Sequence, residues 1–199
     1  MLLFFDTETT GLCITPKGFN RYHPYNQLEY YNPSRLVSIC YKIYRPDGTE
    51  VKTVYKLIKP YGFTISNEKF HGITTKEASE KGITVEELSE MLNNDLDEVK
   101  TIVAHNIGFD TNILCSELHR INKEDLIKKI LLLRQECTVK MGTPICKLKC
   151  RNPKFFKPPR LIELYKHFFG AEATFKQHNA EADVLACVKC YFKMVEPPI

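Results

Sequence analysis

The sequence lacks any apolar run long enough to cross a membrane. Among its 199 residues no uninterrupted apolar run exceeds five, as in MLLFF at the start and ILLL near residue 130. Both fall far short of the roughly 20 residues that a membrane-spanning helix needs. The first run also lacks the preceding basic residues of a signal peptide. We therefore expect an intracellular protein, cytoplasmic or nuclear, with no membrane contact.

The chain does not depend on disulfide bonds, because 199 residues can bury a core without them. Its eight cysteines are Cys13, Cys40, Cys115, Cys137, Cys146, Cys150, Cys187 and Cys190. Cys40, Cys115 and Cys187 lie in apolar-periodic segments, where a reduced cysteine acts as a small hydrophobic residue. We therefore expect reduced thiols, as is usual inside cells.

Two closely spaced cysteine pairs leave a zinc-binding interaction protein as an alternative. Cys146 and Cys150 are four residues apart, and Cys187 and Cys190 are three apart. Thiolates can hold zinc at such spacings. However, the second pair falls in a helical pattern, and the spacings match no common zinc module.

Acidic residues are missing from one segment of a chain whose net charge is only +4. Between Cys137 and Ile162 there is no acid, but there are seven bases: Lys140, Lys147, Lys149, Arg151, Lys154, Lys157 and Arg160. Prolines and Phe155–Phe156 lie among them. The sequence therefore predicts an irregular basic loop at residues 137–158.

The order of the predicted elements indicates one α/β domain over residues 1–199, with a sheet covered by helices. Strands are expected at 2–6, 35–44, 51–59 and 101–106, with a Pro-Asp-Gly hairpin turn between the second and third. Helices are expected at 74–82, 85–99, 109–122, 159–170 and 181–195, with a helical turn at 66–71 and a helical continuation at 123–133. A long connection, 13–35, joins the first two strands.

Acidic residues recur where predicted strands end and helices begin. FFDTETTGL places Asp6 and Glu8 two residues apart, so they share one face if the strand continues. IVAHNIGFD places Asp110 at the start of a helix, and HNAEADV places His178 before the last helix and Asp183 in its first turns. Each acid could instead serve only as a turn residue or a helix N-terminal charge.

Four such carboxylates would repel one another unless a cation lay between them. Mg²⁺ prefers carboxylate, phosphate and water oxygens. Two such ions about 4 Å apart stabilise the attacking and leaving oxygens of phosphodiester cleavage, and a nearby histidine can take the proton of the attacking water. Sequence patterns alone do not show that these three segments lie close together in the folded chain.

DTETTGL, AHNIGFD and HNAEAD, in this order, resemble the three exonuclease motifs of the DnaQ-like family, the DEDD 3′–5′ exonucleases. This family includes the proofreading ε subunit of bacterial DNA polymerase III, oligoribonuclease and ribonuclease T. The resemblance runs from residue 2 to about 192 and includes FHGIT at 70–74. His178 lies five residues before Asp183, whereas Asn179 lies four before it, so the chain is similar to the histidine subtype, DEDDh. The resemblance implies a ribonuclease H-like α/β fold with a mixed central sheet flanked by helices.

The resemblance also implies catalytic roles for five residues. Asp6 would bridge two Mg²⁺ (or Mn²⁺) ions, and Glu8 and Asp183 would complete the protein ligands of the first. Asp110 would hold the second ion through water. His178 would be the general base that takes a proton from the attacking water.

Further positions match those that contact the terminal nucleotide in the family. Thr9 and nearby backbone N–H groups would hold the 3′ hydroxyl, and Leu12 would press on the end base. His71, Asn106 and Phe109 would line the pocket around the terminal nucleotide.

The implied activity is a metal-dependent 3′–5′ exonuclease that releases nucleoside 5′-monophosphates from single-stranded ends, with DNA slightly preferred. An RNA-directed exonuclease of the same family and a catalytically silent nucleic-acid-binding module are the alternatives. A proofreading role would need a polymerase, or another replication or repair protein, as a partner. The candidate nucleic-acid contacts of the basic loop are Lys149, Arg151, Lys154 and Lys157, unless the loop is merely solvated with its phenylalanines in the core. Tyr22, Tyr25, Tyr30 and Tyr31 of the 13–35 connection could stack on bases or simply pack.

Overall fold

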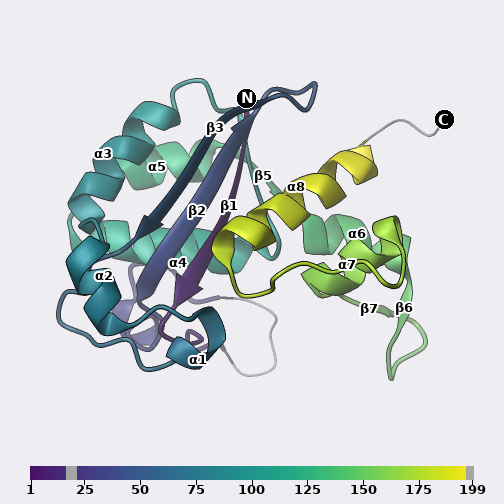
Figure 1. Cartoon of the computed structure of the whole chain (residues 1–199), viewed down its shortest axis with the longest axis horizontal. Coiled ribbons are helices and arrows are strands. Elements are labelled where there is room, and N and C mark those ends of the chain that lie inside the picture. Colours follow the sequence, from purple (N-terminus) through teal and green to yellow (C-terminus); the bar gives the residue numbers. More distant parts are fainter. Residues whose placement is uncertain (17–21, 196–199) are drawn as a thin grey trace.

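A five-stranded mixed sheet forms the centre of the computed structural model, which describes residues 1–16 and 22–195 (Figure 1). The strands are β1 (Leu2–Thr9), β2 (Leu36–Tyr44), β3 (Glu50–Leu57), β4 (Thr101–Ala104) and β5 (Arg134–Cys137), and their order is β3-β2-β1-β4-β5. β1, β2 and β3 pair antiparallel, whereas β4 and β5 run parallel to β1. The mixed sheet with flanking helices confirms the predicted α/β fold class.

Helices cover both faces of the sheet. One face packs against α3 (Val85–Asp95), α4 (Ile107–Arg120) and α5 (Glu124–Leu132), and α8 (Ala180–Val195) crosses the other (Figure 1). Strand alternation sorts the side chains of β1 between them, because Leu3 and Phe5 join the first core and Phe4 joins the core under α8. Asp6 and Glu8 continue the row of Phe4, so β1 turns them toward the α8 side.

Short elements complete the described part of the chain. They are the 3₁₀ turn η1 (Leu28–Tyr30), α1 (Glu68–His71), α2 (Thr75–Lys81), α6 (Thr138–Cys146), β6 (Leu148–Lys149), β7 (Phe156–Lys157) and α7 (Leu161–Phe169). Thr84 begins α3 with a capping box, in which its hydroxyl accepts from the Glu87 N–H and its own N–H donates to the Glu87 carboxylate. The hairpin β2–β3 and the predicted helices are therefore present, with their ends shifted by a few residues.

The prediction of an irregular segment at 137–158 was wrong, because α6 occupies residues 138–146 and β6 pairs with β7. Glycine and proline, here Gly142 and Pro144, both disfavour a helix by local propensity. However, a Cβ on Gly142 would lie 2.6 Å from a methyl group of Leu164, so the glycine is a packing contact between α6 and α7. Pro144 sits near the end of α6, where its missing N–H removes one backbone bond. Long-range packing stabilises this helix despite its sequence.

The connection 13–35 packs against the domain where it is described; its residues 17–21 lie outside the described part. Tyr31 is 1% exposed, and its hydroxyl donates to the His23 carbonyl. Tyr30 stacks on the His23 ring with 3.5 Å between centroids. Tyr22 and Tyr25 are partly buried against the larger core. For Tyr30 and Tyr31 in particular, the contacts favour packing over base stacking.

A buried ion pair ties the end of this connection to α4. The Arg35 guanidinium donates to both carboxylate oxygens of Glu117, at 2.6 and 3.0 Å, and the Glu117 side chain is only 3% exposed. Removing one partner of a buried pair leaves the other charge desolvated. Arg120, whose Nε lies 3.7 Å from Glu117, compensates only in part.

Arg35→Ala is therefore expected to lower the free energy of unfolding by about 3 kcal/mol. Urea denaturation of both proteins measures this change. Arg134→Ala is a matched control, because Arg134 pairs with Glu136 while 75% exposed, and a change of about 1 kcal/mol or less is expected. Equal effects of the two substitutions would contradict the buried ion-pair argument.

None of the helices in the described ranges combines the length and apolar character needed to cross a membrane. All eight cysteines are free thiols, and Cys187 and Cys190 are buried in α8, whereas Cys150 is exposed between β6 and β7. Within residues 1–16 and 22–195, the group of side chains with converging metal-ligand atoms lies elsewhere, at the end of β1.

Candidate active site

Three carboxylates converge where β1 meets the first turn of α8. Ligand oxygens of Asp6, Glu8 and Asp183 all lie within 4.8 Å of one another. Asp183 is held by the Asn179 N–H, which donates to its carboxylate at 3.1 Å, while the Asn179 side chain accepts from the Ala182 N–H and caps the helix. The first and third motifs of the sequence therefore meet in space.

Asp110 approaches the same place from the opposite face of β1. It is 3% exposed in the first turn of α4, and its Oδ1 accepts from the Thr7 N–H at 3.0 Å and the Thr7 hydroxyl at 2.7 Å. Thr7 points away from Asp6 and Glu8 because neighbouring residues of a strand face opposite sides. Asp110 is nevertheless close enough to raise the pKa of both carboxyls. The structure thus gathers all four predicted acids around one strand end.

Burial raises the pKa of all four carboxyl groups, and neighbouring carboxylates raise the pKa of Asp6, Glu8 and Asp110 further. Burial, then the charges of Asp110, Asp183 and Glu8, raise the pKa of Asp6 well above its usual value. Burial first, and then neighbouring charges, raise the pKa of Glu8 to about 7. Burial raises the pKa of Asp110 to about 7 and that of Asp183 to about 6, against opposing hydrogen bonds from backbone or Thr7. A converging set of oxygen donors with unrelieved negative charge fits a hard divalent cation.

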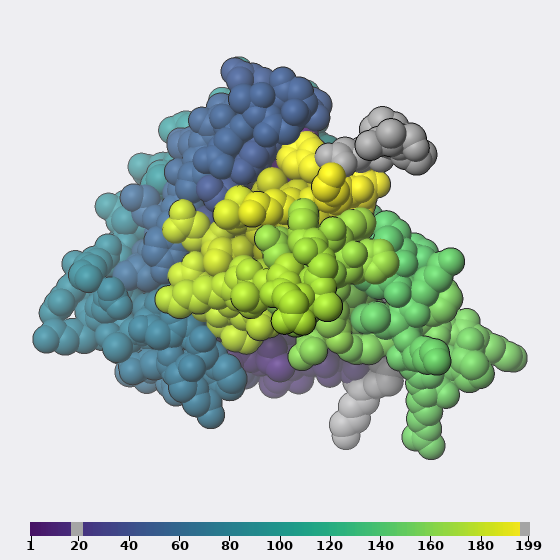
Figure 2. Space-filling model, turned by 45° about the vertical axis from the view of Figure 1, so that its right-hand side comes forward, coloured from purple at the N-terminus to yellow at the C-terminus, as the bar shows by residue number. Residues whose placement is uncertain are grey.

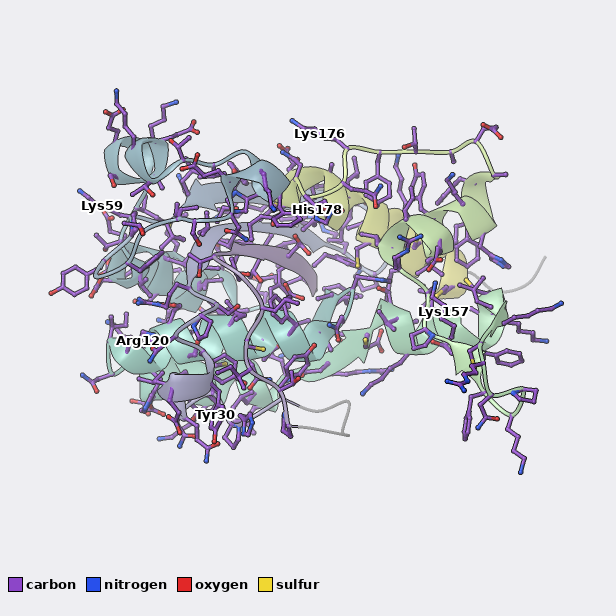
Figure 3. The ribbon with its side chains drawn as sticks, turned by 90° about the horizontal axis from the view of Figure 1, so that it is seen from below. Tyr30, Lys59, Arg120, Lys157, Lys176 and His178 are labelled. Carbon is purple, nitrogen blue, oxygen red and sulfur yellow. The ribbon has the colours of Figure 1, made fainter. Side chains whose placement is uncertain are left out.

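His178 lies in the turn before α8, beside this cluster. Its backbone has a φ of 59°, and its exposed ring is 6.3 Å from the ring of Phe70, centroid to centroid, at 70°. Its charge lowers the pKa of Asp183, which places the imidazole near the carboxylates. Figure 3 views the end of the sheet where β1 finishes, with His178 near the centre. A solvent-accessible imidazole at this position fits a proton acceptor.

Asn67 links Thr9 to His71 at the end of β1, whereas Leu12 is exposed to solvent. The Thr9 hydroxyl donates to the Gly11 carbonyl at 2.7 Å, and the Thr9 carbonyl accepts from Asn67 Nδ2 at 3.0 Å. His71 Nε2 lies 3.3 Å from Asn67 Oδ1. The Leu12 side chain is 81% exposed. Asn67 connects two expected substrate contacts, and no motif in the sequence singled it out.

Asn106 and Phe109 lie at the N-terminus of α4 against Tyr22. Asn106 has a φ of 74°, which asparagine tolerates better than most residues, and its Nδ2 donates to the Tyr22 hydroxyl at 2.8 Å. The Phe109 ring is 6.1 Å from the Tyr22 ring. A Cβ on Gly108 would lie 3.2 Å from the Tyr22 ring, so any larger residue there would require the ring to shift slightly. Sequence reasoning missed the contact because nothing local relates residue 22 to residue 106.

His105 ties this region to α6 and to the chain that follows β7. Its Nε2 lies 3.1 Å from the Pro159 carbonyl, and its Nδ1 lies 2.9 Å from the Thr138 hydroxyl. Burial lowers the pKa of His105 to about 4, so the ring is neutral at pH 7. A carbonyl can only accept, so Nε2 carries the hydrogen and Nδ1 accepts from Thr138. His105 is therefore a structural link rather than a second base.

The model of the exonuclease family matches residues 3–191. The chain belongs to the exonuclease family. This membership confirms the DnaQ-like resemblance of the three motifs, and the matched range includes the four acids and, apart from Leu2, all five strands of the central sheet. No curated protein matches the chain.

Solved structures of Escherichia coli exonuclease I share the fold. The complex with a dT13 oligonucleotide has a TM-score of 0.71 at 19% identity, covering 96% of this chain and 40% of that one. The zinc-ion-bound complex with single-stranded DNA gives 0.72 at 18%, covering 98% and 41%. The complex with a dA16 oligonucleotide gives 0.69 at 19%, covering 98% and 41%. This exonuclease-family chain therefore spans about two fifths of the length of these structures, and at such identities the likeness is one of fold.

Proposed function

We propose that this chain is a divalent-metal-dependent 3′–5′ exonuclease that releases nucleoside 5′-monophosphates from single-stranded ends. The observation that carries the proposal is the convergence of Asp6, Glu8 and Asp183 within 4.8 Å in a member of the exonuclease family. Structures of the same fold in complex with dT13 and dA16 support a nucleic-acid substrate.

Asp6, Glu8 and Asp183 would hold one Mg²⁺ or Mn²⁺ ion, and Asp6 with Asp110 would hold a second, the latter through water. When bound, such ions supply positive charge to the attacking and leaving oxygens of the phosphodiester. The carboxyl groups must be deprotonated to bind metal. Because the pKa values of Glu8 and Asp110 are about 7, metal affinity falls as the pH drops below neutral.

The residues of the chain would divide the reaction between them. The attacking water forms a bond to phosphorus while its proton passes to the His178 imidazole, and the P–O3′ bond breaks. The 5′-monophosphate leaves, and the shortened strand gains a proton on its new 3′ oxygen. Thr9 would position the terminal 3′ hydroxyl and Leu12 the end base, with His71, Asn106 and Phe109 around the terminal nucleotide.

DNA is the preferred substrate in this proposal, since the oligonucleotides bound in the structures of the same fold are DNA. An exoribonuclease is the alternative, because the four acids and His178 would cut either polymer. A catalytically silent binding module is the other alternative, and the presence of all five residues weighs against it.

The proposal is tested by a time course on 5′-labelled single-stranded DNA and RNA of equal sequence, with Mg²⁺, with Mn²⁺ and with chelator. We expect a ladder that shortens from the 3′ end, depends on the divalent ion and runs faster on DNA. Asp97→Ala is expected to behave like wild type, because Asp97 is 72% exposed and directly precedes Glu98, whose carbonyl contacts Met1 at the start of β1, away from the carboxylates at its end. Binding without cleavage under all conditions would favour the silent module.

A further inference from the structure

Residues 147–157 form a projecting β-hairpin, here called the arm. Its two strands pair through Leu148 with Lys157 and Lys149 with Phe156. In Figure 2 the arm is the green projection at the lower right of the molecule. The side chains of the arm belong neither to the three hydrophobic cores nor to the carboxylate cluster. The arm therefore has no part in the chemistry described above.

The outer part of the arm carries positive charge without an acidic partner among the described residues. The exposed cations are Lys147, Lys149, Arg151 and Lys154, and the arm contains no acid. Only its base is neutralised, because Lys157 and Arg160 lie 2.6 and 3.4 Å from Glu163. Although burial opposes the shift, hydrogen bonds from these two residues lower the pKa of Glu163 to about 2. Like charges on so small a hairpin repel one another, so they favour an anionic ligand.

Two exposed aromatic rings lie among these charges. Phe155 is 65% exposed and Phe156 is 45% exposed. The alternative in which both rings are tucked into the core is therefore wrong. Exposed apolar rings are covered favourably by nucleobases, each of which has a π-face, while lysine and arginine attract phosphates. The combination fits a single-stranded nucleic acid better than an acidic protein surface.

The base of the arm is fixed beside the active site. Pro159, two residues after β7, accepts a hydrogen bond from His105 at 3.1 Å, and His105 directly precedes Asn106 at the end of β4. Figure 3 shows His178 near the centre of this end of the molecule and Lys157, the last residue of the arm, to its right. A nucleic-acid strand whose 3′ end lies at the carboxylate cluster therefore has the arm near it.

We propose that the arm binds the phosphates and bases of a single strand on the 5′ side of the cleaved bond. The inference rests on the proposed function and adds to it a contact outside the catalytic cluster. It follows that the arm sets affinity for long strands, whereas hydrolysis of a dinucleotide, too short to reach it, does not depend on it.

The test compares wild type with a variant that carries Lys149→Ala, Arg151→Ala and Lys154→Ala together. Binding of a fluorescent single-stranded DNA of about 20 nucleotides is measured in chelator at several salt concentrations. Each phosphate contact contributes about 0.7 to the slope of log K against log salt, so the slope should become shallower by about 2. We expect the Kd at low salt to rise at least about 10-fold, while dinucleotide hydrolysis with Mg²⁺ stays within about 2-fold.

A second triple variant removes the same net charge elsewhere, through Lys76→Ala, Lys81→Ala and Lys128→Ala. These lysines are 83%, 67% and 71% exposed and each pairs with an acid on its own helix or next to it. Wild-type salt dependence is expected for this control. Equal weakening by both variants, or no weakening by the arm variant, would overturn the proposal, as would parallel loss of dinucleotide hydrolysis.

The aromatic part of the proposal has its own variant. Phe155→Ala is expected to weaken binding of the long strand about 5-fold or more without changing the salt slope, because stacking involves no ion release. An unchanged Kd would show that Phe155 does not contact the bound strand. If wild type hydrolyses neither the dinucleotide nor the long strand, the proposed function fails, and the binding comparison still decides whether the arm contacts nucleic acid.

Discussion

Asp6→Asn is expected to reduce the hydrolysis of single-stranded DNA by about 1000-fold or more. Burial, and then the charges of all three other acids, Asp110, Asp183 and Glu8, raise the pKa of Asp6. It would contact both ions, and ions in such sites contribute several kcal/mol of charge stabilisation, each 1.36 kcal/mol being tenfold in rate. Initial rates at saturating Mg²⁺ measure the effect. Activity within 10-fold of wild type would show that Asp6 is not required for catalysis.

The same substitution is expected to stabilise the metal-free protein at pH 8. The folded state raises the pKa values of four carboxyls that ionise near pH 4 in the unfolded chain. Between about pH 4 and 7 the folded state therefore binds more protons, and the stability of the chelated wild type falls as the pH rises through this window. Asp6→Asn removes one of these charges and keeps the shape of the side chain.

Thermal unfolding in chelator at pH 5 and pH 8 tests this expectation. At pH 8 the Tm of Asp6→Asn should exceed that of wild type by at least about 2 °C, which corresponds to about 1 kcal/mol for a domain of this size. The difference in Tm between Asp6→Asn and wild type should be smaller at pH 5. Asp97→Asn, at an exposed acid, should leave the Tm unchanged at both values. A lower Tm for Asp6→Asn at pH 8 would mean that Asp6 stabilises the fold without metal.

His178→Ala is expected to lower kcat by about 100- to 10,000-fold, the contribution typical of a general base. Binding of the oligonucleotide in chelator should change little, because the imidazole is exposed beside the cluster and is not part of a core. Added imidazole should restore part of the rate, which a merely structural role would not allow. His167→Ala, at an exposed histidine of α7, is the control and should retain full activity. Retention of more than about a tenth of kcat would exclude His178 as the base.

Much of the site could be predicted because it depends on local rules. Strand alternation places Asp6 and Glu8 on one face, and the structure sets both toward α8. The hairpin turn and the capping box at Thr84 likewise follow from a few neighbouring residues. The same alternation indicates that Thr7 points toward the helices on the other face. Its hydrogen bonds to Asp110 could be seen only in the structure.

Contacts between distant segments could not be predicted. In α6, Gly142 lies against Leu164 of α7, a contact that local helix propensity does not contain. Tyr22 meets Asn106 across 84 positions of the sequence. The sequence indicated the arm only as an acid-free run, whereas the structure shows the pairing of β6 with β7 and the exposure of Phe155 and Phe156.

The alternating side chains of β1 have a consequence for how this chain can vary. Loss of one residue between Phe4 and Asp6 would exchange the two faces, turning the acids toward α4 and threonine toward α8. The strand therefore tolerates no change in length. Insertions can be accommodated in the connection after β1 and in the arm after α6, because both lie outside the five-stranded sheet. Growth of either segment would therefore leave the strand that positions Asp6 and Glu8 unchanged.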